Sequence, residues 1–179
     1  MTQIGSVYGE ALYGLAREEG LDKTILDQLS VLNQSFRQEA DFVRLLSTPN
    51  LSKQDRCRVV DDCFRGKVQP YVLNFLKILT ERGYVHHFSD CCKAYRALYN
   101  RDHGILPVTA VTAVALSDDQ SRRLTEKLGN LTGKTIELTN RVDPACMGGV
   151  RLNYDGKQLD DTVAHRLDAI RGLLRSTVL

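Results

Sequence analysis

The spacing of apolar residues changes once along this chain, close to residue 105. Before that point apolar residues recur every three or four positions, which is the period of an amphipathic helix. After it, stretches such as residues 135–142 alternate between apolar and polar residues, which is typical of a strand with one buried face. We therefore expect a helical part followed by a part that contains a sheet.

The first part is expected to form a bundle of six helices. The apolar spacing and the helix-stop residues place them at about 4–16, 22–39, 42–46, 52–66, 70–83 and 85–104. Pro70 suits the first turn of the fifth helix, where its missing N–H costs nothing. This helix is apolar over most of its circumference, so we expect it to be central to the bundle or shared between the core and a partner.

The second part is expected to be a small α/β domain. Its pattern predicts, in order, a strand, a helix capped by Ser117, a second strand, a hairpin and a terminal helix with Val163, Leu167, Ile170 and Leu174 in one stripe; the strands are placed at 108–116, 135–142, 150–154 and 157–159. Asp155 and Gly156 supply the positive φ angles of a tight hairpin turn. Gly148 and Gly149 predict either a bulge or a close backbone approach. The predicted class is α+β, with domains at 1–104 and 105–179.

Composition excludes several classes of protein. No run approaches the roughly 20 apolar residues of a spanning helix, and the first residues do not resemble an export signal. The net charge of +2 gives no case for a nucleic-acid partner. The cysteine count is odd, at five, which favours free thiols in a reducing compartment.

Three stretches carry residues that could support chemistry, and each has a simpler interpretation. Residues 129–135 resemble a phosphate-binding loop, but they are expected to end a helix and open a strand, the reverse of that motif. Residues 86–92 gather histidines and cysteines without the second spaced pair of a structural zinc site. Asp160 and Asp161 are interpreted as caps of the terminal helix. We therefore expect no catalytic residue, no metal and no cofactor.

The first helix is rich in small residues, which are Gly5, Gly9, Ala11 and Gly14. Small side chains let another helix approach closely. The partner is either a helix of the same chain or a helix of another protein that docks in a groove.

Three sequence motifs resemble the delta subunit of bacterial F-type ATP synthases, the counterpart of the mitochondrial oligomycin-sensitivity-conferring subunit. Residues 7–13 (VYGEALY) look like the family's first-helix motif, and residues 74–83 (NFLKILTERG) look like its fifth-helix motif. The third match runs from 113–117 through Val142-Asp143-Pro144 and 148–150 to Asp160, Val163 and Leu167. The hairpin and the start of the last helix depart from the family's usual residues, which puts in doubt only their local details.

The resemblance implies a non-catalytic stator subunit. It implies that the helical domain holds an N-terminal helix of an alpha subunit in a groove between the first and fifth helices, and that the second domain binds the C-terminal ends of the b subunits. By the same resemblance the groove residues are Val7, Tyr8, Ala11, Leu12, Leu15, Tyr71, Asn74, Phe75, Ile78 and Arg82.

The family's location is the cytoplasmic face of the bacterial inner membrane, with membrane association only through the complex. Two alternatives from other classes are a helical RNA-binding or transcription adaptor, and a small enzyme that acts through Asp161 and His165. The adaptor should show a basic face, which the balanced charges do not suggest.

Overall fold

The chain divides into two compact units, which are residues 1–99 (unit 1) and 100–179 (unit 2). The structure, a computed structural model, describes residues 2–48, 51–163, 165 and 167. It is mostly helical with a small mixed sheet in unit 2, so the predicted α+β class is confirmed. The division between the units lies inside the last helix of unit 1, five residues before the predicted domain boundary.

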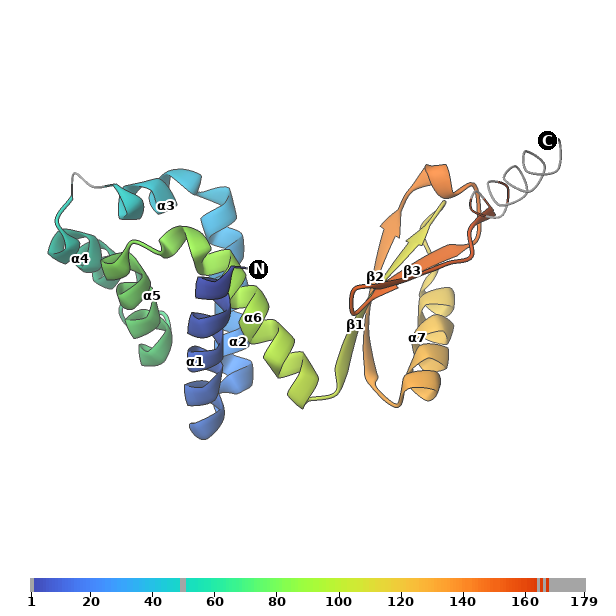
Figure 1. Cartoon of the computed structure of the whole chain (residues 1–179), viewed down its shortest axis with the longest axis horizontal. Coiled ribbons are helices and arrows are strands. Elements are labelled where there is room, and N and C mark those ends of the chain that lie inside the picture. Colours follow the sequence, from blue (N-terminus) through green and yellow to red (C-terminus); the bar gives the residue numbers. More distant parts are fainter. Residues whose placement is uncertain (1, 49–50, 164, 166, 168–179) are drawn as a thin grey trace, which may run out of the picture. The chain divides into compact units, whose positions relative to one another are not determined.

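Unit 1 is built from helices (Figure 1). They are α1 (Gln3–Glu18), α2 (Asp22–Gln38), α3 (Ala40–Ser47), α4 (Lys53–Phe64), α5 (Pro70–Arg82), the 3-10 helix η1 (Val85–His87) and α6 (Phe88–Asp102), which continues into unit 2. Pro70 is at the start of α5 as predicted, and Gly83 ends that helix in the left-handed conformation. Ser52 caps α4 by accepting a hydrogen bond from the Asp55 backbone N–H.

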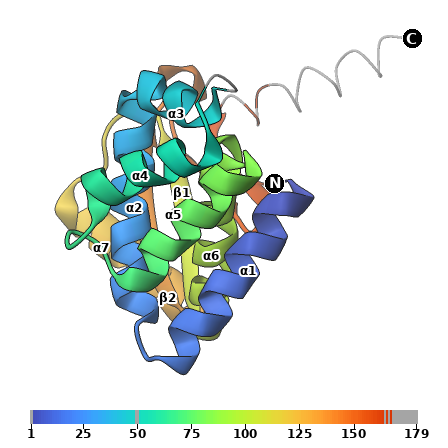
Figure 2. The same ribbon diagram turned by 90° about the vertical axis from the view of Figure 1, so that its left-hand side faces the viewer.

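The core of unit 1 is apolar and rich in aromatic rings. Its largest fully buried side chains include Tyr95 and Phe88 of α6 and Leu79 of α5. Helix α5 contacts α1, α2, α4 and η1, and it lies between α4 and α1 (Figures 1 and 2). This is the central position that is one of the two alternatives predicted from its nearly all-round apolar surface.

The described part of unit 2 contains a four-stranded mixed sheet with one helix, α7 (Asp118–Thr132), against it (Figure 1). The strands are β1 (Ile105–Thr112), β2 (Thr135–Val142), β3 (Val150–Tyr154) and β4 (Lys157–Asp160), with a short 3-10 helix η2 (Pro144–Cys146) between β2 and β3. Their order is β2-β1-β3-β4. β1 pairs with β2 in parallel and with β3 antiparallel, and β3 pairs antiparallel with β4.

The core of unit 2 lies between the sheet and α7. Val108, Ala110, Ile136 and Leu152 are buried there, and Leu124 and Leu128 of α7 pack against them. The cap predicted at Ser117 is present as a full capping box, with Ser117 and Gln120 exchanging hydrogen bonds.

The predicted first strand is wrong at both ends, because β1 spans Ile105–Thr112 and not 108–116. The alternation of apolar residues continues past the point where pairing stops. The Thr112 hydroxyl donates to the carbonyl of Val114, and the Asn140 side chain accepts from the Leu116 N–H. These bonds turn the chain away from the sheet, and Val114 is left 74% exposed.

The terminal helix of the sequence prediction falls largely outside the described residues, since Ile170 and Leu174 are not among them. Of the predicted apolar stripe, Val163 and Leu167 are described and both are exposed.

Candidate interaction face on α1 and α5

Helix α1 packs tightly against α6 through two glycines. A Cβ atom at Gly9 would lie 2.7 Å from both the Ala94 Cβ and the Cys91 carbonyl oxygen. A Cβ atom at Gly5 would lie 2.6 Å from the Asp90 Cβ. Two of the small residues in the first helix therefore serve packing within the chain. The other two, Ala11 and Gly14, are exposed.

Helix α5 is fixed on one side to α4 and on the other to α1. On the α4 side, the Lys77 ammonium lies 2.6 Å from the Asp61 carboxylate, and the Cys57 thiol donates to the Lys77 carbonyl oxygen at 3.9 Å. On the α1 side, the Tyr71 hydroxyl interacts with the Glu19 carboxylate. This interaction, followed by burial, raises the pKa of Tyr71 above its usual value.

The contacts at the two ends show that α1 and α5 are antiparallel. Tyr71 at the start of α5 meets Glu19 at the end of α1. The rings of Tyr8 near the start of α1 and Tyr84 just after α5 are 6.1 Å apart, edge to face. Interpolation between these contacts brings Ile78 level with about residue 13 of α1, between Ala11 and Leu15.

An exposed, partly apolar face runs along this helix pair. Its large aliphatic side chains are Val7 at 58%, Leu15 at 49% and Ile78 at 45% exposed. Ala11, Asn74 and Arg82 are also exposed, and Tyr8 and Tyr71 are half-buried at the seam. We call these residues the α1/α5 face: Val7, Tyr8, Ala11, Leu15, Tyr71, Asn74, Ile78 and Arg82.

Two of the ten residues named from the sequence are not part of this face. Leu12 is 4% and Phe75 is 6% exposed, so the structure places both in the core beneath the face. Exposed aliphatic side chains gain roughly 1.5–3 kcal/mol each when they are fully buried. Val7, Leu15 and Ile78 are therefore the side chains of this face that still have apolar surface to bury, while Leu12 and Phe75 lie in the core beneath them.

The turn residues predicted in unit 2 adopt the expected conformations. Asp155 has φ of 46° and Gly156 has φ of 71°, which suits the tight hairpin turn between β3 and β4. Gly149 is a site of close backbone approach, because a Cβ atom there would lie 2.3 Å from the Asp161 carbonyl oxygen. Gly148 lies beside Val163, and its carbonyl oxygen accepts the Val163 N–H.

The cap of the last helix differs from the prediction. Thr162, which is buried, accepts the His165 backbone N–H on its hydroxyl oxygen, so Thr162 fills the capping position. The Asp160 carboxylate instead accepts hydrogen bonds from the Thr162 N–H at 3.0 Å and hydroxyl at 2.7 Å. These bonds hold the pKa of Asp160 below its usual value.

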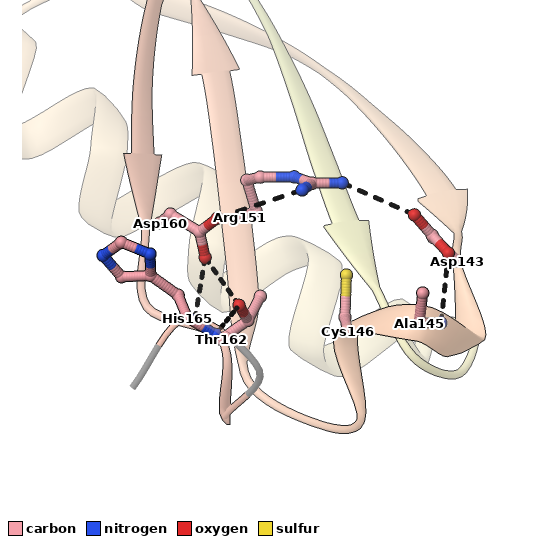
Figure 3. Close-up of a pocket in the computed structure, with 7 residues that line it drawn as sticks. All are labelled: Asp143, Ala145, Cys146, Arg151, Asp160, Thr162 and His165. Atoms are coloured by element: carbon pink, nitrogen blue, oxygen red, sulfur yellow. Dashed lines mark hydrogen bonds and ion pairs between the residues drawn. The ribbon is translucent and has the colours of Figure 1, made fainter. Parts of the chain in front are cut away.

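A polar hollow of about 170 Å³ lies beside this cap (Figure 3). The Arg151 guanidinium spans it, 3.5 Å from the Asp143 carboxylate and 3.9 Å from that of Asp160. Cys146 lines the hollow but is buried, and the His165 residue at its edge is exposed. Both carboxylates and the guanidinium are engaged with one another, so the arrangement ties η2 and the end of β4 to β3.

The remaining chemical candidates take structural roles. Residues 129–135 end α7 and open β2, with Gly133 in the left-handed conformation, so the helix-stop interpretation is confirmed. All five cysteines are free. Cys91 and Cys92 are buried, and burial raises their pKa values to about 11 and about 12. Within the described residues, no group of three or more His, Cys, Asp or Glu side chains could hold a metal ion.

Comparisons with known proteins point to the same family over nearly the whole chain. Residues 4–174 match the family model described as ATP synthase delta (OSCP) subunit. Proteins named ATP synthase subunit delta are similar to it: one from Clostridioides difficile (strain 630) is 29% identical over 176 residues, covering 98% of this chain and 97% of the relative. Another, from Desulfitobacterium hafniense (strain DSM 10664 / DCB-2), is 30% identical over 168 residues, covering 94% of each.

A solved structure shares the fold. A chain in the mitochondrial ATP synthase hexamer of Toxoplasma gondii superposes with a TM-score of 0.76 at 20% identity, covering 97% of this chain and 98% of that one.

Proposed function

Because the chain belongs to the ATP synthase delta (OSCP) subunit family, a structural component of the peripheral stalk, we propose that it joins the catalytic head of the synthase to that stalk. In this proposal unit 1 holds an N-terminal helix of an alpha subunit on the α1/α5 face. Unit 2 binds the C-terminal ends of the b subunits. The link couples proton flow to ATP synthesis without any catalytic step of its own.

The α1/α5 face is the observation that carries the first half of the proposal. It presents three exposed aliphatic side chains on two packed helices, with the small Ala11 among them. An amphipathic helix laid along such a seam buries apolar anchors spaced by one helical turn. Ile78 belongs to α5, and Val7 and Leu15 belong to α1, so both helices contribute to the contact.

Unit 2 supports the second half of the proposal. It has a core of its own and presents exposed apolar side chains, among them Met147 at 70% and Leu159 at 58%. We propose that these side chains lie in the contact with the second partner polypeptide. A connector needs two binding surfaces that do not compete, and we propose that each of the two compact units carries one of them.

The chain is proposed to reach the membrane only through its partners. In the part of the chain that the structure describes, no helix has the length and apolar character needed to cross a bilayer. We place the protein at the cytoplasmic face of a bacterial inner membrane, as part of the membrane-bound synthase.

Ala11→Arg tests the face directly. The full chain is titrated with a synthetic peptide of the alpha-subunit N-terminus from the same organism, and Kd is measured by calorimetry. A docked helix would bury the new guanidinium without a partner, so we expect a loss of about 3 kcal/mol, or roughly a hundredfold in Kd. Ala97→Arg, at an exposed alanine of α6, is the matched control and should leave Kd unchanged.

Either of two outcomes would contradict the proposal. Full affinity in Ala11→Arg would exclude the α1/α5 face as the binding site. No binding of the peptide to the unaltered chain would exclude the alpha-subunit helix as the partner of unit 1.

A further inference from the structure

The first turn of α1 is tied to α6 by one carboxylate. The Asp90 Oδ2 atom accepts hydrogen bonds from the Thr2 backbone N–H at 3.1 Å and from the Thr2 hydroxyl at 3.0 Å. The same hydroxyl oxygen accepts the Gly5 N–H at 3.3 Å, which makes Thr2 the N-cap of α1. One side chain therefore both caps α1 and joins it to a residue 88 positions away.

Asp90 is itself held in place by its contacts with Gly5 and Lys93. It lies directly under the first turn, where the absence of a side chain at Gly5 leaves just enough room for its Cβ atom. Its other oxygen, Oδ1, accepts the Lys93 ammonium at 3.2 Å. Hydrogen bonds from Lys93 and then from Thr2 hold the pKa of Asp90 below its usual value. The carboxylate is therefore charged near neutral pH, and hydrogen bonds to a charged acceptor are the stronger kind.

The first turn of α1, which Thr2 joins to Asp90, adjoins the α1/α5 face. Val7 and Tyr8 lie in the next turn, and they form the end of the face that meets Tyr84. A helix end that frays lets these side chains move away from α5, since the first turn has few hydrogen bonds of its own. Thr2 and Asp90 are not part of the face, but their hydrogen bonds hold the turn that precedes Val7 and Tyr8.

We propose that Asp90 is a positioning residue for partner binding, which holds the N-terminal end of the α1/α5 face in place through Thr2. The inference rests on the proposed function, because it concerns the affinity of that face for the alpha-subunit helix. Asp90 does not contact the partner. It keeps Val7 and Tyr8 in register with α5, so the partner helix meets a surface that is already formed.

The test uses the full chain with Asp90→Ala, Asp90→Asn and Thr2→Ala. Three quantities are measured: the Kd for the alpha-subunit N-terminal peptide, amide hydrogen exchange along α1, and the urea midpoint of unfolding. In Asp90→Ala we expect faster exchange at Gly5 and Ser6, unchanged exchange at Ala16, and a Kd weaker by about tenfold. Asp90→Asn keeps an acceptor oxygen and should recover part of the affinity.

Lys93→Ala is the matched control. It removes the partner of Oδ1 and leaves both bonds to Thr2, so exchange in α1 and peptide affinity should stay as in the unaltered chain. The effect of Thr2→Ala should also shrink once Asp90 is already alanine, because the two residues act through one contact.

The outcomes separate the inference from the function on which it rests. If Asp90→Ala loosens the first turn but binds the peptide as tightly as before, the positioning role is refuted while the face remains the binding site. An equal loss in Lys93→Ala would refute it as well. If Asp90→Ala does not fold, Thr2→Ala decides: faster exchange with unchanged Kd overturns the inference. If the unaltered chain does not bind the peptide, the proposed function fails first.

Discussion

Gly9 and Gly14 lie on the same helix, but we expect substitution by alanine to change the free energy of unfolding in opposite directions at the two positions. In a helix interior, alanine is ordinarily more stable than glycine by about 0.5–1 kcal/mol. A Cβ atom at Gly14 meets nothing within 4 Å, so Gly14→Ala should gain this amount in the free energy of unfolding. A Cβ atom at Gly9 would lie 2.7 Å from a backbone oxygen of α6, where ordinary contact begins at 3.4 Å.

The stability cost of Gly9→Ala follows from the difference between this distance and an ordinary contact distance. Since 3.4 minus 2.7 is 0.7, α1 and α6 would have to separate by about 0.7 Å. The Cys91 carbonyl belongs to a helix and cannot turn aside, unlike the end of a flexible side chain. Overpacking of this kind costs about 1–3 kcal/mol. The helix-propensity gain is the same at both positions, so this cost is also the expected stability difference between Gly14→Ala and Gly9→Ala.

The tyrosine signal in circular dichroism allows the thermal unfolding of unit 1 to be measured specifically. Every tyrosine except Tyr154 lies in unit 1, and the chain has no tryptophan, so near-ultraviolet circular dichroism reports mainly on that unit. For a unit of this size, 1 kcal/mol corresponds to about 4–8 °C in Tm, so the two variants should differ by at least about 4 °C. Equal Tm values for Gly9→Ala and Gly14→Ala would show that α1 does not pack on α6 at this distance.

Two further predictions concern a helix cap and an ion pair. Thr162→Ala should lower the stability of unit 2 by about 1 kcal/mol, while Thr162→Ser should restore it; urea unfolding checks this, and equal stability of the two variants would contradict the cap. Lys77, and then Arg65, hold the pKa of Asp61 below its ordinary value of 3.8, so its contribution to stability is present above that pH and is lost as the pH falls through the lowered value. Between pH 6 and pH 3, Asp61→Asn should therefore lose less stability than the unaltered chain, and an unchanged pH dependence would refute this ion pair.

Local signals in the sequence were sufficient for most of the elements. Helix spacing, the Ser117 cap, the Gly83 stop and the Asp155-Gly156 turn each depend on residues within a few positions of one another. Such signals act the same way in any fold, so they could be read before the structure was known.

The features that the sequence did not predict correctly have a different cause in common. They depend on contacts between distant parts of the chain. Alternation alone could not show that β1 stops at Thr112, because its end depends on the Asn140 side chain of β2. Spacing did not separate the buried Leu12 from the exposed Leu15, since which side faces α6 is a tertiary fact.

The tie between Thr2 and Asp90 gave no signal in the sequence at all, because it joins residues 88 positions apart. Near the last helix, three consecutive residues could each act as the cap. The hydrogen bond from the His165 N–H selects Thr162.

The contacts at the two ends of the α1/α5 pair have a mechanical consequence. Tyr8 contacts Tyr84 and Tyr71 contacts Glu19 at opposite ends of the pair, so sliding one helix along the other would break one of these contacts. Under the proposed function, the seam would thus be formed before the partner helix docks, and the ordering entropy of docking would fall mainly on that helix. Two contacts set so far apart would also resist sideways displacement of the helices, which is the load that the proposed link between the catalytic head and the stalk would meet at every turn of the rotor.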